Sequence, residues 1–141
     1  MTSLIHAVDL TKYFQVGKNR FLHAVDKVNF DIQEGKTLGV VGESGCGKST
    51  LGRVALGLLP ATSGELYYRD KNILLKGKIN KELRKEMQIV FQDPYSSLNP
   101  RMSVYELIAE PLVRNHVYSK RQDTLKRVVE LMDTVGLAQR F

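Results

Sequence analysis

The sequence has a single cysteine and no long apolar run. One cysteine among 141 residues excludes a disulfide framework and a four-cysteine zinc site, and it favours a reducing compartment. No apolar segment approaches the roughly 20 residues that are needed to span a bilayer. Residues 1–6 also lack the charged and apolar regions of a signal peptide. We therefore expect any contact with a membrane to be made through a partner protein.

Acidic residues are outnumbered by basic ones, 15 to 21, which gives a formal net charge of +6. Seven of the basic residues and only three acidic ones lie between Arg69 and Glu86. Such a patch can bind nucleic acid, but no aromatic side chain that would stack on bases is interleaved in it. We expect a solvated face of a hairpin and a short helix, and no nucleic-acid partner.

Apolar residues at alternate positions predict two strands in the first third of the chain, over Leu4–Leu10 and His23–Ile32. Residues 17–20, Gly-Lys-Asn-Arg, have the composition of a turn between them. The continuous apolar runs Thr37–Val41 and Met87–Phe91 predict two strands that are buried on both faces. The first part of the chain is therefore expected to be rich in strands.

Helical periodicity and capping residues predict three helices. The first follows a glycine-rich stretch and should stop at Pro60. The second should begin at a capping box over Ser103–Glu106 and end at Pro111. The third should run from a capping box over Ser119–Gln122 to Gly136. Its predicted buried face consists of Leu125, Val128, Val129 and Met132.

Residues 42–49, Gly-Glu-Ser-Gly-Cys-Gly-Lys-Ser, match the spacing of a phosphate-binding loop. The loop follows a predicted buried strand and opens a predicted helix, which is the context that the motif requires. Its glycines allow backbone conformations closed to other residues, so that successive N–H groups can surround an anion. The partial positive charge of the helix N-terminus adds to this attraction. The segment therefore predicts a site for a nucleoside triphosphate.

The side chains of this loop have separate predicted roles. Lys48 supplies a positive charge to the β- and γ-phosphates, and the Ser49 hydroxyl ligates the Mg²⁺ that bridges them. Cys46 is interpreted as a small spacer that points away from the phosphates, in preference to a reactive thiol. The predicted nucleotide-binding residues of the loop are Gly42, Glu43, Ser44, Gly45, Cys46, Gly47, Lys48, Ser49 and Thr50.

Two further signals lie outside the loop. Gln92 directly follows the predicted strand Met87–Phe91, at the strand end where open α/β sheets place ligand groups. Its neutral amide can complete the Mg²⁺ shell or hold the attacking water. Tyr13 and Phe14 follow the first strand, and either ring can stack on a nucleotide base or belong to ordinary strand packing. The three histidines show no ligand spacing and no carboxylate partner, so we expect ordinary surface or strand positions for His6, His23 and His116.

The loop and three other segments resemble the ATPase subunits of ATP-binding-cassette transporters: residues 57–60, 63–64 and 90–94. The longer string over residues 91–104, Phe-Gln-Asp-Pro-Tyr-Ser-Ser-Leu-Asn-Pro-Arg-Met-Ser-Val, resembles the subgroup of oligopeptide, dipeptide and nickel importers. The resemblance covers essentially the whole chain. It implies an α/β P-loop NTPase fold with an antiparallel β-subdomain, a RecA-like core of strand, P-loop and helix, and the start of a helical subdomain.

The resemblance also implies roles for particular residues. Residues 1–93 would form the β-subdomain and part of the core, and residues 94–141 would begin the helical subdomain. Gln92 would be the Q-loop glutamine, which senses Mg²⁺ and the γ-phosphate near the transmembrane partner. Phe14 would stack on adenine, because it follows a Thr-Lys pair by two residues, with Tyr13 as the alternative.

The function implied by the resemblance is ATP-driven uptake of dipeptides or oligopeptides, with nickel as the other cargo of the subgroup. ATP and Mg²⁺ would be the cofactors. The partners would be a second ATP-binding subunit in a head-to-tail dimer, the transmembrane permease subunits and, indirectly, an extracytoplasmic peptide-binding protein. The chain would lie peripherally at the cytoplasmic face of the membrane.

The family's signature motif, its strand ending in Asp-Glu and its switch histidine do not occur in these 141 residues. We therefore expect an N-terminal part of a nucleotide-binding domain, which binds ATP at best and has no general base for hydrolysis. Three alternative interpretations stay open: a small P-loop kinase, a non-transport cassette ATPase that acts on ribosomes or DNA, and a truncated gene product without a transport role.

Overall fold

The computed structural model describes residues 3–75, 78–79, 83, 86–93 and 97–137. The chain divides into two compact units, Met1–Ile89 and Val90–Phe141, and each is described by itself. The division lies a few residues before the subdomain boundary expected after residue 93. The assignment of the two subdomains stays a prediction.

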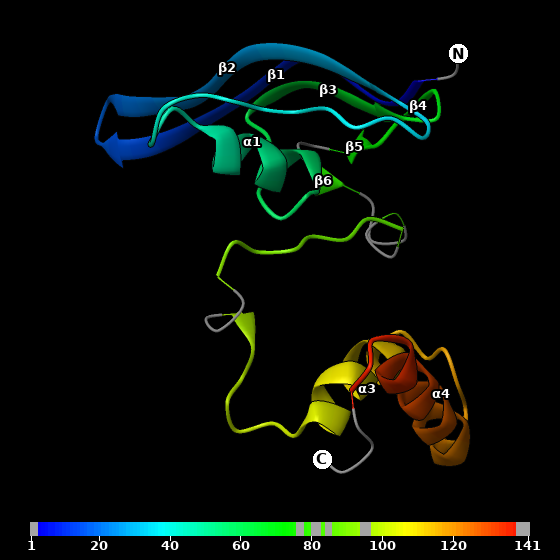
Figure 1. The fold of residues 1–141 in the computed structure, drawn as a ribbon. Coiled ribbons are helices and arrows are strands. Elements are labelled where there is room, and N and C mark those ends of the chain that lie inside the picture. The colour runs from blue at the N-terminus through cyan, green and yellow to red at the C-terminus, as the bar shows by residue number, and fades with distance from the viewer. Residues whose placement is uncertain (1–2, 76–77, 80–82, 84–85, 94–96, 138–141) are drawn as a thin grey trace. The chain divides into compact units, whose positions relative to one another are not determined.

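The first unit is built on a four-stranded antiparallel sheet with the strand order β2-β1-β3-β4 (Figure 1). The predicted strands Leu4–Leu10 and His23–Ile32 lie within the longer strands β1 and β2. A turn at Lys18 and Asn19 joins these two strands into a hairpin. A smaller sheet pairs two short strands. The strands are β1 (Ser3–Gly17), β2 (Arg20–Gln33), β3 (Ser63–Tyr68), β4 (Lys71–Asn72), β5 (Leu74–Leu75) and β6 (Lys78–Ile79).

Helix α1 (Lys48–Ala55) packs against one face of this sheet, as Figure 1 shows. The core lies between them, because Val54 of the helix is fully buried against apolar side chains of the strands. Its buried members are Ala7, Leu10, Val54, Ala61, Leu66 and Ile73.

The prediction that Pro60 ends this first helix is wrong, because α1 ends at Ala55. Gly57 takes a left-handed conformation with φ 68°. The Leu58 N–H then donates to the Arg53 carbonyl at 2.8 Å, and the Gly57 N–H donates to the Val54 carbonyl at 3.0 Å. This pair of bonds is a Schellman motif, which satisfies the last carbonyls of the helix before the proline is reached.

The two strands predicted to be buried on both faces are absent. Residues 37–41 and 87–91 have no regular secondary structure, and their side chains are largely exposed, Val41 by 95% and Val90 by 96%. An apolar run forms a central strand only when neighbouring strands satisfy its backbone groups on both sides. No strand within the described ranges pairs with either run. The strand predictions for Thr37–Val41 and Met87–Phe91 are therefore wrong for this chain.

In the second unit, helix α3 (Val104–Arg114) begins at the predicted capping box. The Ser103 Oγ accepts from the Glu106 N–H at 3.2 Å, and the Glu106 carboxylate accepts from the Ser103 N–H at 2.7 Å. Pro111 lies inside the helix, so the prediction that it ends there is wrong. The helix continues for one turn past the proline, and its C-cap residue Asn115 donates to the Pro111 carbonyl from the backbone N–H at 3.1 Å and from the side chain at 2.9 Å.

Helix α4 (Arg121–Thr134) packs on α3 through Val128 and Met132, which are buried together with Ala109. Its N-cap is Lys120, without a side-chain hydrogen bond, so the predicted capping box over Ser119–Gln122 is wrong. Leu125 is 50% exposed, and Thr124 takes the buried position one turn before Val128. The predicted end at Gly136 is confirmed by its left-handed φ of 72° and by a Leu137 N–H bond to the Met132 carbonyl at 2.9 Å.

Replacement of Ser103 by alanine is expected to destabilise α3 by about 1 kcal/mol, because the helix loses its N-cap oxygen. The Glu106 carboxylate makes a second contribution, because hydrogen bonds from the Ser103 backbone and side chain lower its pKa, and this contribution is fully present above the ordinary carboxyl pKa. It should disappear as the pH falls through the lowered pKa of Glu106. Amide hydrogen exchange in α3 of the intact chain measures both effects. Glu106→Gln should remove the pH dependence, and an unchanged exchange rate in Ser103→Ala would contradict the prediction.

Candidate nucleotide-binding site

The predicted phosphate-binding loop runs directly into α1, and two of its glycines have left-handed backbone conformations. Gly45 and Gly47 have φ values of 82° and 100°, which residues with a side chain rarely adopt. Gly47 is the N-cap of α1, and its carbonyl accepts from the Leu51 N–H at 2.8 Å. The unusual conformations expected for the loop glycines are therefore found at Gly45 and Gly47, but not at Gly42, which has no positive φ.

The loop lies against strand β2, and this contact requires a glycine. A Cβ on Gly47 would lie 2.1 Å from the Ala24 carbonyl oxygen, so any other residue must push the loop away from the strand. A Cβ on Gly42 would lie 2.7 Å from the Cys46 sulfur, so a larger residue there requires the Cys46 side chain to move. The backbone of the loop is thus packed closely against β2 at Gly47 and against the Cys46 side chain at Gly42.

Lys48 closes this loop on itself. Its ammonium group donates to the carbonyls of Gly42 at 2.7 Å and Glu43 at 2.5 Å, and it lies 3.7 Å from the Cys46 sulfur. Two backbone oxygens of the loop therefore hold the positive charge of Lys48 in place. The Cys46 thiol is exposed beside it, and the interpretation of this residue as a spacer stays a prediction.

A cavity of about 330 Å³ joins the loop to the β1–β2 hairpin. Phe14 lines the same cavity as Lys48 and Ser49, so the fold brings together residues that lie far apart in the sequence. Its full lining consists of Phe14, Leu22, His23, Ala24, Gly45, Cys46, Gly47, Lys48, Ser49 and Thr50. This volume is that of a small-molecule pocket, and its lining combines apolar side chains of the hairpin with polar groups of the loop.

The apolar end of the cavity is formed by a cross-strand pair. Phe14 of β1 lies opposite Leu22 of β2, and Leu22 is 56% exposed although it is apolar. The Lys12 ammonium lies 5.0 Å from the centroid of the Phe14 ring. Leu22 was not found by our sequence reasoning. The turn at residues 18–19 is the signal for it, because a short turn there places residues 22 and 23 opposite the aromatic pair.

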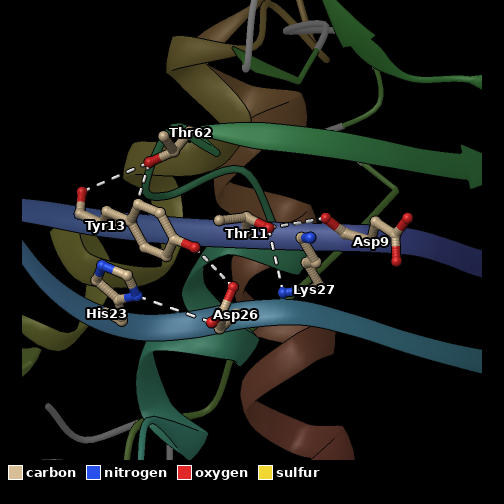
Figure 2. A network of polar contacts seen from close by, with 7 residues as sticks. All are labelled: Asp9, Thr11, Tyr13, His23, Asp26, Lys27 and Thr62. Atoms are coloured by element: carbon tan, nitrogen blue, oxygen red, sulfur yellow. Dashed lines mark hydrogen bonds and ion pairs between the residues drawn. The ribbon is translucent and has the colours of Figure 1, made fainter.

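Tyr13 is engaged elsewhere and does not line the cavity. Its hydroxyl donates to the Asp26 carboxylate at 2.6 Å, and its ring stacks on His23 with centroids 3.8 Å apart (Figure 2). This hydrogen bond raises the pKa of Tyr13 and lowers the pKa of Asp26. Of the two aromatic candidates, Phe14 is therefore the one whose position suits contact with a ligand in the cavity.

Two histidines have carboxylate partners, so the sequence expectation that they lack them is wrong. The Nδ1 of His23 lies 3.7 Å from an Asp26 oxygen, and the Nδ1 of His6 lies 3.6 Å from an Asp31 oxygen. The second pair is separated by 25 residues in the sequence and meets only because β1 and β2 are paired. His23 also lines the cavity, which the sequence did not indicate.

The predicted metal ligands occupy different parts of the chain. Ser49 is exposed at the first turn of α1 and lines the cavity, so its hydroxyl is available to a cation there. Gln92 is exposed and belongs to the second unit, and its role stays a prediction. The described residues contain no group of three or more His, Cys, Asp or Glu side chains that could hold a metal ion. Residues 94–96 of the importer-like string lie outside the described residues.

Comparison with known families gives one match that covers most of the chain. The family model described as ABC transporter matches residues 25–141. A putative oligopeptide transport ATP-binding protein of Bacillus subtilis, YkfD, is 46% identical over 98% of this chain and 42% of its own length. The dipeptide transport ATP-binding protein DppF of Haemophilus influenzae is 45% identical over 99% of this chain and 44% of its own length. The chain thus spans less than half the length of these curated relatives.

Solved structures give the same result for the fold. The bacterial ABC transporter cassette MJ0796, in its dimeric structure, is 27% identical and superposes with a TM-score of 0.74. The match covers 97% of this chain and 59% of that cassette. The cassette cbiO1 of Clostridium perfringens, described as part of the complex cbiONQ, is 26% identical with a TM-score of 0.71 over 97% of this chain and 52% of its own. The expected fold class, with an antiparallel sheet followed by helices, is confirmed.

Proposed function

Because the chain belongs to the ABC transporter family, we propose that it is the nucleotide-binding part of an importer ATPase and that its cavity holds ATP. The observation that carries the proposal is the position of Phe14 in the same cavity as the phosphate-binding loop. A nucleoside triphosphate has a flat base at one end and a polyanion at the other. The cavity offers an aromatic and aliphatic surface at one end and backbone donors with a lysine at the other.

The triphosphate would lie on the loop at the N-terminus of α1. The N–H groups around Gly45 and Gly47, the helix dipole and the Lys48 ammonium all favour negative charge there. Mg²⁺ would supply charge neutralisation and bridge two phosphates, with the Ser49 hydroxyl as the protein ligand in the cavity. Gln92, whose amide oxygen can ligate a cation, would be the second protein ligand of the metal. Lys48 would exchange its bonds to the Gly42 and Glu43 carbonyls for phosphate oxygens.

The base would lie against Phe14 and Leu22. Base–aromatic stacking contributes about 1–3 kcal/mol per base, and the opposed leucine extends the apolar surface on the neighbouring strand. Replacement of Phe14 by alanine is expected to weaken ATP binding by about tenfold and to leave the affinity for inorganic tripolyphosphate unchanged. Isothermal titration calorimetry with both ligands measures this. Phe21→Ala is the matched control, because it removes an exposed aromatic ring from the same hairpin outside the cavity lining, and an equal loss for both ligands in Phe14→Ala would contradict the assignment.

The relatives named as oligopeptide and dipeptide transport proteins support peptide import as the process that ATP would drive. We propose dipeptides or oligopeptides as the cargo, selected by permease subunits and an extracytoplasmic binding protein. The dimeric cassette structures support a second ATP-binding subunit as partner. No helix in the described part of the chain is long and apolar enough to cross a membrane. We place the chain peripherally, at the cytoplasmic face of the membrane, through the permease subunits.

For these 141 residues we propose binding without appreciable turnover. The phosphate-binding loop lies within the sequence, whereas the family's signature motif and Asp-Glu strand end do not. Calorimetric titration of the chain with Mg-ATP, alongside a phosphate-release assay, tests both halves of the proposal. Saturable binding with phosphate release at the level of buffer alone is the expected result. Absence of saturable binding would overturn the proposal, and turnover at the rate of a complete subunit would overturn its second half.

A further inference from the structure

The base-binding end of the cavity lies on a part of the sheet that has only two strands. Strand β3 begins at Ser63, which pairs with Thr11, and β1 continues beyond that point to Gly17, where β2 is the only strand among the described residues that pairs with it. Phe14 and Leu22 lie on this two-stranded extension. An isolated two-stranded ribbon is marginally stable in water. The position of the Phe14 backbone therefore depends on the contacts that support this two-stranded part of β1 and β2 beyond the start of β3.

Thr62 supplies that support from the segment between α1 and β3. Its Oγ1 accepts from the Tyr13 N–H at 2.9 Å and donates to the Tyr13 carbonyl at 3.5 Å (Figure 2). Its own N–H donates to the Thr11 carbonyl at 2.8 Å. The hydroxyl thus takes the place of a strand residue at the position where the ladder between β1 and β3 has ended. The N–H and the carbonyl of Tyr13 are thus both hydrogen-bonded to the Thr62 side chain.

A second tie holds the same residue from the opposite strand. The Tyr13 hydroxyl donates to Asp26 of β2, and the ring stacks on His23, which lies directly opposite in the register. Tyr13 is therefore fixed through its backbone on one side and through its side chain on the other. Because Phe14 is the next residue, the direction of its Cα–Cβ bond follows from the backbone position of Tyr13.

We propose that Thr62 is a positioning residue for the nucleotide base, which fixes the backbone of Tyr13 and thereby presents Phe14 to the cavity. The inference rests on the proposed nucleotide function and adds to it a residue that lines no part of the cavity. Thr62 also follows α1 in the chain, and α1 begins at the phosphate-binding loop. The two ends of the site are thus held by one continuous segment, which preorganises their spacing.

The test replaces Thr62 by valine, which keeps the shape of the side chain and removes the hydroxyl. Thr62 is exposed, so the substitution leaves the core packing intact. We expect ATP binding to weaken by about fivefold, which corresponds to the loss of about one hydrogen bond's contribution. The affinity for inorganic tripolyphosphate should stay unchanged, and this second ligand also reports that the phosphate loop is folded. Thr62→Ser retains the hydroxyl and should bind ATP like the unsubstituted chain.

A double substitution separates positioning from a general structural effect. In a Phe14→Ala background, Thr62→Val should cause no further loss of ATP affinity, because the ring that it positions is gone. Equal weakening of ATP and tripolyphosphate, additive losses in the double variant, or unchanged ATP affinity in Thr62→Val would each overturn the inference. If the unsubstituted chain binds tripolyphosphate but not ATP, the proposed binding of the nucleotide base is wrong, and the proposed function is wrong with it. If Phe14→Ala lowers ATP affinity while Thr62→Val does not, only the inference fails.

Discussion

Replacement of Lys48 by alanine is expected to reduce the affinity for Mg-ATP by at least about a hundredfold. The ammonium group has two roles that are lost together. It closes the loop by donating to the Gly42 and Glu43 carbonyls, and it would bring the only side-chain positive charge of the cavity lining to the phosphates. A charge-assisted hydrogen bond is roughly twice as strong as a neutral one, and a loss of about 2.7 kcal/mol is a hundredfold in affinity.

The matched control for this variant is Lys36→Ala, which removes the same charge from an exposed position in the turn after β2 and outside the cavity. Its affinity for Mg-ATP should stay within about twofold of the unsubstituted chain, because exposed charges at a distance are screened. Calorimetry at fixed ionic strength compares the two variants. Similar affinities in Lys48→Ala and Lys36→Ala would show that the loop does not hold the triphosphate.

Replacement of Gly47 by alanine is expected to have the largest effect on folding of any single substitution in the loop. Two costs add at this residue. A φ of 100° is strained for alanine, and the new Cβ would lie 2.1 Å from the Ala24 carbonyl oxygen. Backbone strain and overpacking each cost about 1–3 kcal/mol. We expect a loss of about 2–6 kcal/mol in the free energy of unfolding and loss of tripolyphosphate binding, because the loop must leave β2.

Two glycines of the same unit separate the two costs. Gly35 has a φ of 72° with no atom within 4 Å of its Cβ position, so Gly35→Ala measures strain without a clash. Gly52 lies within α1 and is also open, so Gly52→Ala has neither cost and should stabilise the helix slightly. Urea denaturation of the three variants should rank them with Gly47→Ala lowest and Gly52→Ala highest. If Gly47→Ala is no less stable than Gly35→Ala, the close contact between the loop and β2 is wrong.

Local signals in the sequence were sufficient for the elements that local chemistry determines. The Gly17–Arg20 turn predicted the hairpin, the Ser103 and Glu106 pair predicted the start of α3, and the spacing of residues 42–49 predicted the cradle before α1. In each case the residues that form the structure are neighbours in the chain. Interpretation of these segments needs no knowledge of what packs on them.

Signals that depend on distant partners failed. Thr37–Val41 has the composition of a central strand, but a central strand exists only with neighbours, and none pairs with it among the described residues. Pro111 was expected to end a helix, but the helix continues for one turn past it. A capping box was expected over Ser119–Gln122, but the N-cap of α4 is Lys120, one residue later, and no side-chain cap forms there.

The residues of the candidate site fall into the same two groups, those with a local signal in the sequence and those that depend on distant partners. The loop residues were evident from their spacing, whereas Leu22 and His23 joined the cavity through the register of a hairpin that contains irregularities between Lys12 and Tyr13. Thr62 could not be found from the sequence, because its bonds to Tyr13 span 49 residues and depend on where β3 begins. The family resemblance already favoured Phe14 over Tyr13 as the stacking residue, and in the structure Phe14 is the one of the two that lines the cavity.

The most direct test of the account is a nuclear magnetic resonance titration of the isotope-labelled chain with the two halves of its proposed ligand. Inorganic tripolyphosphate should shift the backbone amide signals of Gly45, Gly47 and Ser49 and leave those of Phe14 and Leu22 in place. Adenosine should do the reverse, and Mg-ATP should shift both groups at once. If tripolyphosphate and adenosine perturb the same amides, or if neither perturbs the loop, the cavity does not bind a nucleotide with its base on the hairpin and its phosphates on α1.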